Sequence, residues 1–193
     1  EHLTFLNTDV KKTDYVSKRL PYPLEPGDTT AYEEIVSTLY DPLDRAKLEW
    51  AVGAIVSGDA KNIQKFLVLY GPGGSGKSTY LNIIHRLFGD YCAMFDAKSL
   101  TSSTNAFATE AFKDNPLVAI QHDGDLSKIE DNAKLNSIVS HEEILINEKY
   151  KPGYNARINA FLFMGTNKPV KITDAKSGII RRLIDVNPSG RLI

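Results

Sequence analysis

The nine residues from Gly71 to Thr79, GPGGSGKST, constrain the fold of this chain more than any other stretch. They follow four apolar or aromatic residues, Leu67 to Tyr70, which are typical of a buried strand, and they lead into a helical pattern. Glycines at this spacing let successive backbone N–H groups point inward, and the next helix begins with its partial positive end facing the same point. The order of strand, glycine-rich loop and helix therefore predicts a phosphate-binding P-loop, in the Walker A pattern.

Each part of this loop has an expected role. The residues expected to contact the nucleotide are Gly71, Pro72, Gly73, Gly74, Ser75, Gly76, Lys77, Ser78 and Thr79. Lys77 is expected to reach the β- and γ-phosphates, and the Ser78 hydroxyl to coordinate Mg²⁺. The alternative is a chance glycine-rich turn, which the preceding strand and the following helix argue against. The sequence therefore predicts that the chain binds ATP with Mg²⁺.

Composition limits the size and setting of the fold around this loop. With 193 residues, 42% of them hydrophobic, the chain can bury one α/β core with a small appended subdomain. The formal net charge of -1 provides no global basic field, so any contact with nucleic acid must come from a local cluster of Lys and Arg. The single cysteine, Cys92, excludes an intrachain disulfide and fits a reducing compartment. No run approaches about 20 apolar residues and no signal-like segment follows Glu1, so we expect a soluble protein, without membrane contact, excised from something longer.

Three parts are expected along the chain: an arm or linker at 1–28, a small helical subdomain at 29–60, and the P-loop core at 61–193. The arm contains LPYPLEPGD, whose prolines and glycine prevent regular structure. The first helix of the subdomain is expected to begin with a capping box formed by Thr30 and Glu33.

The second helix of this subdomain is expected to begin at Asp41, a favourable N-cap that stands directly before Pro42. One apolar face is predicted for it, formed by Leu43, Ala46, Trp50, Ala51, Ala54 and Ile55. Trp50 is expected to be a core anchor rather than a stacking platform.

Acidic residues follow the second apolar run of the core, Leu117 to Ile120. Asp123 and Asp125 come just beyond the carboxyl end of this predicted strand, where nucleotide chemistry occurs in open α/β sheets. One of them should act as a Walker B acid that helps to hold Mg²⁺ and orients the attacking water, with Asp123 as the first choice and Asp125 as the reserve. A solvated Asp-Gly-Asp turn is the alternative. His122 is interpreted as a polar neighbour, because no set of residues at metal-ligand spacing accompanies it.

The hydrophobic period then changes to two, which is typical of strands. Ile144 to Tyr150 and Arg157 to Phe163 predict a hairpin over 143–163. Its expected tip, KYKPGY, places four side chains at a projecting point: Lys149, Tyr150, Lys151 and Tyr154. Cations beside aromatic faces favour contact with DNA, and the alternative is a plain solvated surface hairpin.

Two further groups of polar residues follow the hairpin. Asn167 stands just beyond the third predicted strand, Phe161 to Gly165, where an amide can hold the attacking water or sense the γ-phosphate without adding charge. Arg181 and Arg182 begin a last apolar run, beyond the other parts of the site.

Together these motifs resemble the superfamily 3 helicases, a branch of the AAA+ ATPases of viruses, phages and plasmids. The matching stretches span roughly 61–186 and are GPGGSGKST, the strand ending in HDGD, NEKYKPGY, FLFMGTNKP and IIRRLIDV. They look most like the helicase half of phage and plasmid primase-helicases. The TN-x-P sequence after a strand, with paired arginines downstream, is more specific to this family than Walker A alone, which all P-loop proteins share. One departure is His122, which precedes Asp123 where the family usually shows two adjacent acids.

The resemblance implies a fold and a set of roles. The implied fold is an α/β P-loop NTPase of AAA+-like type, with a central, mainly parallel sheet flanked by helices and a small N-terminal helical subdomain. Asn167 would be the sensor 1 residue, the hairpin would contact DNA, and one arginine, Arg182 in preference to Arg181, would reach the ATP of a neighbouring subunit.

The implied function is an ATP-dependent DNA helicase motor, assembled as a ring, expected to be a hexamer, on single-stranded or forked DNA. A primase, attached or separate, is an implied partner, and the implied location is the cytoplasm of a bacterial host, with a virus-encoded origin as the other option. The alternative is an AAA+ initiator, loader or other P-loop switch that remodels a partner without translocating. A small-molecule kinase is a weaker third possibility, because no segment indicates an acceptor pocket and a lid.

Overall fold

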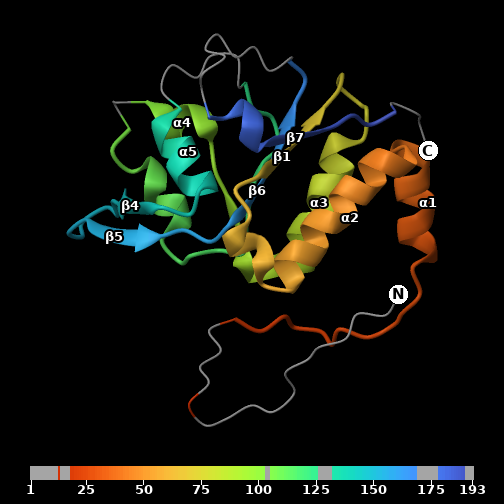
Figure 1. Cartoon of the computed structure of the whole chain (residues 1–193), viewed down its shortest axis with the longest axis horizontal. Coiled ribbons are helices and arrows are strands. Elements are labelled where there is room, and N and C mark those ends of the chain that lie inside the picture. The colour runs from red at the N-terminus through yellow and green to blue at the C-terminus, as the bar shows by residue number, and fades with distance from the viewer. Residues whose placement is uncertain (1–12, 14–17, 103–104, 126–131, 169–177, 190–193) are drawn as a thin grey trace.

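A parallel sheet of five strands forms the centre of the molecule (Figure 1). The computed structural model describes residues 13, 18–102, 105–125, 132–168 and 178–189. In spatial order the strands are β2 (Cys92–Met94), β3 (Val118–Gln121), β6 (Phe161–Thr166), β1 (Phe66–Tyr70) and β7 (Leu183–Val186). Every ladder between these strands is parallel, which confirms the predicted α/β fold.

Helices cover both faces of this sheet, so alternate strand residues enter two separate cores. In β1, Leu67 and Leu69 pack into one core, whereas Phe66 and Val68 pack into the other. The first core is covered by α1 (Thr30–Leu39), α2 (Pro42–Val56) and α3 (Lys77–Phe88), and the second by α4 (Ala97–Thr101) and α5 (Ala133–Val139), as Figure 1 shows. Short 3-10 turns complete the chain at η1 (Asp59–Asn62), η2 (Gly89–Tyr91), η3 (Ala108–Phe112) and η5 (Ile180–Arg182). Across the described ranges, none of the helices has the length and apolar character to cross a bilayer.

The order of the strands decides which loops meet. Strand β6 lies between β1 and β3, with Thr166 opposite Tyr70 and Met164 opposite Gln121. The P-loop follows β1, and the loop with Asp123 and Asp125, called the acidic loop below, follows β3. Both loops and the segment after β6 therefore leave the sheet at the same carboxyl edge, where open parallel sheets bind their ligands.

The two N-terminal helices begin at different kinds of cap. Asp41 caps α2 as predicted, because its side chain accepts the N–H of Asp44 at 2.8 Å. The capping box predicted for α1 is wrong. Asp28 instead accepts both the N–H and the hydroxyl of Thr30, and the Glu33 carboxylate turns away to pair with an arginine of α2. Thr29 is the N-cap residue of α1 and its side chain makes no capping hydrogen bond, so the Asp28 carboxylate contacts the first helical residue from outside the helix.

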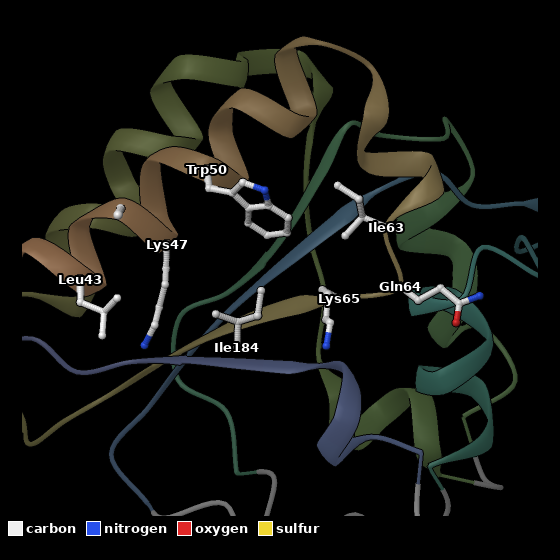
Figure 2. Close-up of a pocket in the computed structure, with 8 residues that line it drawn as sticks. Leu43, Lys47, Trp50, Ile63, Gln64, Lys65 and Ile184 are labelled. Carbon is white, nitrogen blue, oxygen red and sulfur yellow. The ribbon is translucent and has the colours of Figure 1, made fainter.

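The apolar face predicted for α2 is only partly buried. Ala51, Ala54 and Ile55 lie in the core, but Leu43 and Trp50 are 68% and 44% exposed. The expectation that Trp50 anchors the core is therefore wrong. The reason is that α2 turns Leu48 and the Asp44 carboxylate inward, so that Leu43 and Trp50 lie beside β7 (Figure 2). The Trp50 ring still makes an edge-on contact with Phe161, at 6.3 Å between the ring centroids. The consequence is an open apolar surface between α2 and β7.

The same helix closes the outer edge of the sheet. The Lys47 Nζ donates to the carbonyl oxygen of Asp185 at 2.7 Å, and the Asp44 carboxylate accepts the N–H of Asn187 at 2.7 Å. Lys47 and Asp44 also pair with each other at 2.7 Å. Backbone groups two residues apart point to the same side of a strand, so this ion pair covers the side of β7 that faces away from β1.

The predicted hairpin is present but shorter than expected. It consists of β4 (Glu143–Ile146) and β5 (Tyr154–Arg157), paired antiparallel with Ile146 opposite Tyr154. The prediction that its second strand runs from Arg157 to Phe163 is wrong, because the chain bends after β5 and 161–166 joins the main sheet as β6. At this bend Ile158 is buried and the Asn159 N–H donates to the side chain of Asn115.

The arm lies outside both cores except at a few points. In its described part, Lys18 to Asp28, there is neither helix nor strand. The Tyr22 hydroxyl donates to the carbonyl oxygen of Leu87, and the Arg19 N–H donates to the Tyr91 hydroxyl at 2.9 Å. These bonds attach the arm, at Arg19 and Tyr22, to η2 and to the carboxyl end of α3.

Candidate nucleotide-binding site

The P-loop joins β1 to α3, in the position that the sequence predicts. Gly74 and Gly76 have φ angles of +77° and +97°, in the left-handed region where any side chain would be strained. A Cβ at Gly76 would come within 2.6 Å of the Leu39 side chain, so the end of α1 packs directly on the loop. On the other side, the Gly71 N–H donates to the carbonyl oxygen of Thr166 at 3.1 Å. The loop is thus held between α1 and the end of β6.

Lys77 lies across the loop and is almost fully buried. Its Nζ donates to the carbonyl oxygens of Gly71 and Pro72 at 2.7 and 2.8 Å. Burial lowers the pKa of Lys77, and the negative charge of Asp123 opposes that shift. Asp123 therefore lies near enough for its charge to act on the lysine. A cation held by weak neutral acceptors beside a carboxylate can exchange them for phosphate oxygens.

The residues after Lys77 suit a magnesium ion that arrives with a nucleotide. Mg²⁺ in such sites takes one or two protein oxygens together with phosphate and water oxygens. The Ser78 hydroxyl and the Asp123 carboxylate are of that kind, and both residues are exposed. Among the described residues, no group of three or more His, Cys, Asp or Glu could hold a metal ion without such help.

The two acids after β3 lie in different electrostatic surroundings. Asp125 pairs with the Nζ of Lys168 at 2.7 Å, which joins the loop after β3 to the loop after β6. This pairing raises the pKa of Lys168, with a smaller contribution from Asp123. Asp123 is the acid whose charge acts on Lys77. Its choice as the Walker B acid stays a prediction that this difference favours.

Close backbone contact fixes the loop after β3 against strand β6. The Gly124 N–H donates to the carbonyl oxygen of Gly165 at 2.8 Å. A Cβ at Gly165 would lie only 2.4 Å from the carbonyl oxygen of His122, so no side chain fits there without movement. At the end of β3 itself, the Gln121 side chain accepts the N–H of Ala97, which ties the strand to α4.

Asn167 directly follows β6, which lies between β1, the strand before the P-loop, and β3, the strand before Asp123 and Asp125. The preceding Thr166 is buried, and its hydroxyl bonds to both the N–H and the carbonyl group of Lys168 at 3.1 Å. This turn leaves Asn167 exposed at the carboxyl edge. Its predicted role as a water-positioning or sensor residue stays a prediction, now with a defined place beside β1 and β3.

The hairpin tip carries the residues predicted to contact DNA, but they are not equivalent. Tyr150 is fully exposed and has a φ of +64°, and Lys149 beside it is also exposed. Lys151 instead pairs with the buried Glu148 at 2.7 Å. This pair lowers the pKa of Glu148 and raises that of Lys151. Tyr154 is 39% exposed.

Contacts with the segment before β3 hold the tip in place. The Asn147 N–H donates to the Thr109 hydroxyl at 3.1 Å, and the Asn147 amide donates to the carbonyl oxygen of Ala106 at 2.9 Å. The tip is therefore tied to η3, and Tyr150 projects from an anchored loop.

The two arginines lie near the amino ends of the parallel strands, whereas the P-loop of the same chain lies at their carboxyl ends. They precede the amino end of β7, and the register pairs Phe66 with Leu183, whereas the P-loop follows the carboxyl end of β1. A strand of five residues spans about 16 Å, so neither arginine is close to the P-loop of its own chain.

Their side chains also differ from each other. Arg182 is buried, and its guanidinium donates to the carbonyl oxygen of Gly178 at 2.9 Å and to the Ser140 hydroxyl at 2.7 Å. Burial lowers the pKa of Arg182. Arg181 is exposed. This geometry does not support the preference for Arg182 over Arg181 as a residue that reaches another subunit.

Three features of the site were absent from the sequence analysis. The sequence motifs do not indicate a functional role for Lys168, Gly165 or Glu148. For Lys168 and Gly165 the usable signal was their position on either side of Thr166-Asn167, in a stretch already singled out. For Glu148 no local signal existed, because its burial depends on Lys151 and on the fold of the tip.

Comparisons with known proteins agree with this fold. A sequence-family model described as "Family of unknown function (DUF5906)" matches residues 69–182, a range that includes every part of the candidate site. Among solved structures, the apo structure of the NrS-1 C-terminal region (305-718) gives a TM-score of 0.60 at 15% identity, covering 82% of this chain and 38% of that one. Its A form gives 0.59 at 16% identity, with coverages of 81% and 36%.

A viral protein is similar as well. A structure of JCV helicase with a bound small molecule gives a TM-score of 0.52 at 13% identity, covering 81% of this chain and 43% of that one. The chain spans less than half the length of each of these structures. At such identities the comparisons establish a shared, helicase-like α/β fold.

Proposed function

This chain belongs to DUF5906, a family of unknown function, and from the geometry of its site we propose that it is a Mg²⁺-dependent ATPase that serves as the motor of a DNA helicase. One observation carries the proposal. A buried lysine on a P-loop lies within electrostatic reach of Asp123, and Asn167 emerges from the strand between them. These are the groups that phosphoryl transfer to water requires: a phosphate cradle, a carboxylate and a polar group for the attacking water.

Binding would begin with an exchange at Lys77. The β- and γ-phosphate oxygens would replace the carbonyl oxygens of Gly71 and Pro72, because an anionic oxygen attracts the lysine ammonium more strongly than a neutral carbonyl oxygen does. The N–H groups at the start of α3 would face the same phosphates. Burial of the lysine disfavours its charge, and an anionic ligand removes that penalty.

Hydrolysis would use the acids and the amide at the carboxyl edge. Ser78 and Asp123 would hold Mg²⁺, which when bound supplies positive charge to the γ-phosphoryl oxygens. Asp123 would also orient the attacking water, together with Asn167. Asp125 is paired with Lys168, whereas the charge of Asp123 acts on Lys77, so Asp123 would be the acid that acts on the nucleotide.

A complete site would then need a second subunit. Arg181 is exposed near the amino ends of the strands, far from the P-loop of its own chain, and this position supports contact with the ATP of a neighbouring subunit. We propose that the subunits form a head-to-tail ring of six. An arginine supplied by a neighbour is worth about 10³ to 10⁵ in rate in related NTPases. The projecting Tyr150 and Lys149 would contact single-stranded DNA by stacking and by charge. The fold shared with JCV helicase supports a motor of this kind.

The test is a steady-state ATPase assay with and without single-stranded DNA, with Lys77→Ala as the inactive control. Mg²⁺-dependent hydrolysis that DNA stimulates, and that the control lacks, supports the proposal. Hydrolysis that DNA leaves unchanged would favour a loader or switch that does not translocate. If Lys77→Ala hydrolysed ATP as fast as the wild type, the assignment of the nucleotide site to this loop would be wrong.

A mixing experiment tests the arginine in trans. Arg181→Ala and Lys77→Ala proteins are each expected to be inactive alone, and a mixed ring joins an intact P-loop to an intact arginine at some interfaces. Partial recovery of hydrolysis on mixing is therefore expected. No recovery, although the two proteins co-assemble and Arg181→Ala still binds ATP, would contradict a role between subunits.

A further inference from the structure

An open apolar groove lies between α2 and the edge strand β7, as Figure 2 shows. Its volume is about 580 Å³. The residues that matter to its chemistry are Leu43, Lys47 and Trp50 of α2, Ile63 and Lys65 before β1, and Ile184 of β7. Leu43 and Trp50 belong to the face that the sequence marks as apolar, yet they are 68% and 44% exposed. An uncovered apolar surface of this kind is typical of a contact site.

The two ends of this groove differ in charge. At one end Lys47 is neutralised, because it pairs with Asp44 at 2.7 Å. At the other end Lys65 is exposed and donates to the carbonyl oxygen of Arg181. Within the described ranges, no carboxylate lies within ion-pair distance of Lys65 or Arg181. The groove is therefore suited to a segment that pairs an apolar side chain with an acidic one.

The arm of this chain has that chemistry. Leu24 is 50% exposed, and Glu25 beside it is exposed. They lie between Pro23 and Pro26, and each proline fixes its φ angle, so an extended segment loses little conformational entropy when it binds. Within its own chain the arm is attached by earlier residues, such as Tyr22 to α3, and half of the Leu24 side chain stays exposed for contact with another molecule.

We propose that the groove binds the arm of a second copy of this chain, with Leu24 of that copy beside Trp50 and its Glu25 facing Lys65. The contact joins two different surfaces, so it repeats head to tail and can close into a ring. The inference rests on the proposed function in one respect: Arg181, placed there between subunits, adjoins the Lys65 end of the groove. Docking of the arm would then bring the neighbouring subunit next to that arginine.

The experiment uses Trp50 as its probe, because it is the only tryptophan in the chain. The full-length protein is titrated with a synthetic peptide of the arm, LPYPLEPGD, and Trp50 emission is followed without nucleotide. A saturable change is expected. A peptide with Leu24→Asp should bind about ten-fold more weakly, since it loses the burial of one leucine.

Protein variants then test the groove itself. Leu43→Glu should weaken binding of the wild-type peptide about ten-fold, and it should fold normally, because Leu43 is exposed in the first turn of α2, where an acid is favourable. Met94→Glu, at an exposed apolar residue of β2, is the matched control and should leave binding unchanged. Lys65→Glu should weaken binding several-fold, and a peptide with Glu25→Lys should restore it.

Sizing of the full chain completes the test. Self-association should weaken in Leu43→Glu and persist in Met94→Glu. No saturable change in Trp50 emission, equal binding by Leu43→Glu, or failure of the reciprocal charge exchange would each overturn the proposal. Self-association that Leu43→Glu weakens while the peptide does not bind would mean that a different part of the second copy covers the groove. All these readings are made without nucleotide, so a failure of ATP hydrolysis would leave them unaffected.

Discussion

Replacing Gly165 by alanine measures how strictly the acidic loop depends on its neighbour. The new Cβ would lie 2.4 Å from the carbonyl oxygen of His122, roughly 1 Å inside ordinary contact distance. The neighbouring atom is backbone, so it cannot rotate away. The loop that carries Asp123 must shift, and the bond from the Gly124 N–H to the Gly165 carbonyl oxygen must stretch or break.

Two magnitudes follow from this displacement. Overpacking of this kind costs about 1–3 kcal/mol of stability, and each kcal/mol lowers the melting temperature by about 2–4 °C in a chain of this size. A misplacement of about 1 Å can cost about 100-fold in turnover. We expect kcat for ATP to fall by that order while nucleotide binding at the P-loop is largely kept. Thermal unfolding without nucleotide and steady-state ATPase kinetics measure the two effects separately.

Gly53→Ala is the matched control for this substitution. Gly53 lies inside α2, and its added Cβ would meet nothing within 4 Å. Alanine should therefore raise stability, by about 0.5–1 kcal/mol, and leave turnover unchanged. A Gly165→Ala protein with the melting temperature and turnover of the wild type would refute the backbone contact between β6 and the loop that carries Asp123.

Other substitutions separate residues that look alike in the sequence. Asp123→Asn should keep ATP binding and lower kcat at least about 100-fold, whereas Asp125→Asn should do less, and a reversed ranking in the ATPase assay would reassign the acid. Lys149→Ala should lower the slope of log affinity against log salt for single-stranded DNA by about 0.7. Lys151→Ala should lower this slope by less, because Lys151 is paired with Glu148. Filter binding at several salt concentrations measures both slopes. Arg182→Ala should lower the free energy of unfolding by about 1–3 kcal/mol, since it removes hydrogen bonds of a buried guanidinium, and an unchanged denaturation midpoint would show that those bonds contribute nothing.

Local patterns predicted the elements of the site well. The strand, the glycine-rich loop and the helix from 66 to 88 are in place, because each depends on residues that are close in the chain. The parallel sheet follows from strands separated by helical segments. The acids and the amide meet at one edge because parallel strands all end there, which is a consequence of topology alone.

Contacts between distant segments were beyond those patterns. The pairing of Lys168 with Asp125 joins residues 43 positions apart, and nothing in either loop encodes it. The burial of Arg182 rather than Arg181 depends on Ser140 and Gly178, so two adjacent arginines could not be told apart. Trp50 was mistaken for a core residue because helical periodicity gives the apolar face but not its covering.

The ion pair of Asp44 and Lys47 at the edge of the sheet has a consequence for how copies of this chain can join. An uncovered edge strand invites another strand to pair with it, and repeated pairing produces open-ended aggregates. Here the side chains of α2 already bond to Asp185 and Asn187, so a strand arriving at β7 would have to break a partly buried ion pair before it gained any ladder bond. At the opposite edge, β2 is only three residues long and offers little to extend. Growth of the sheet from one molecule into the next is thus disfavoured at both ends.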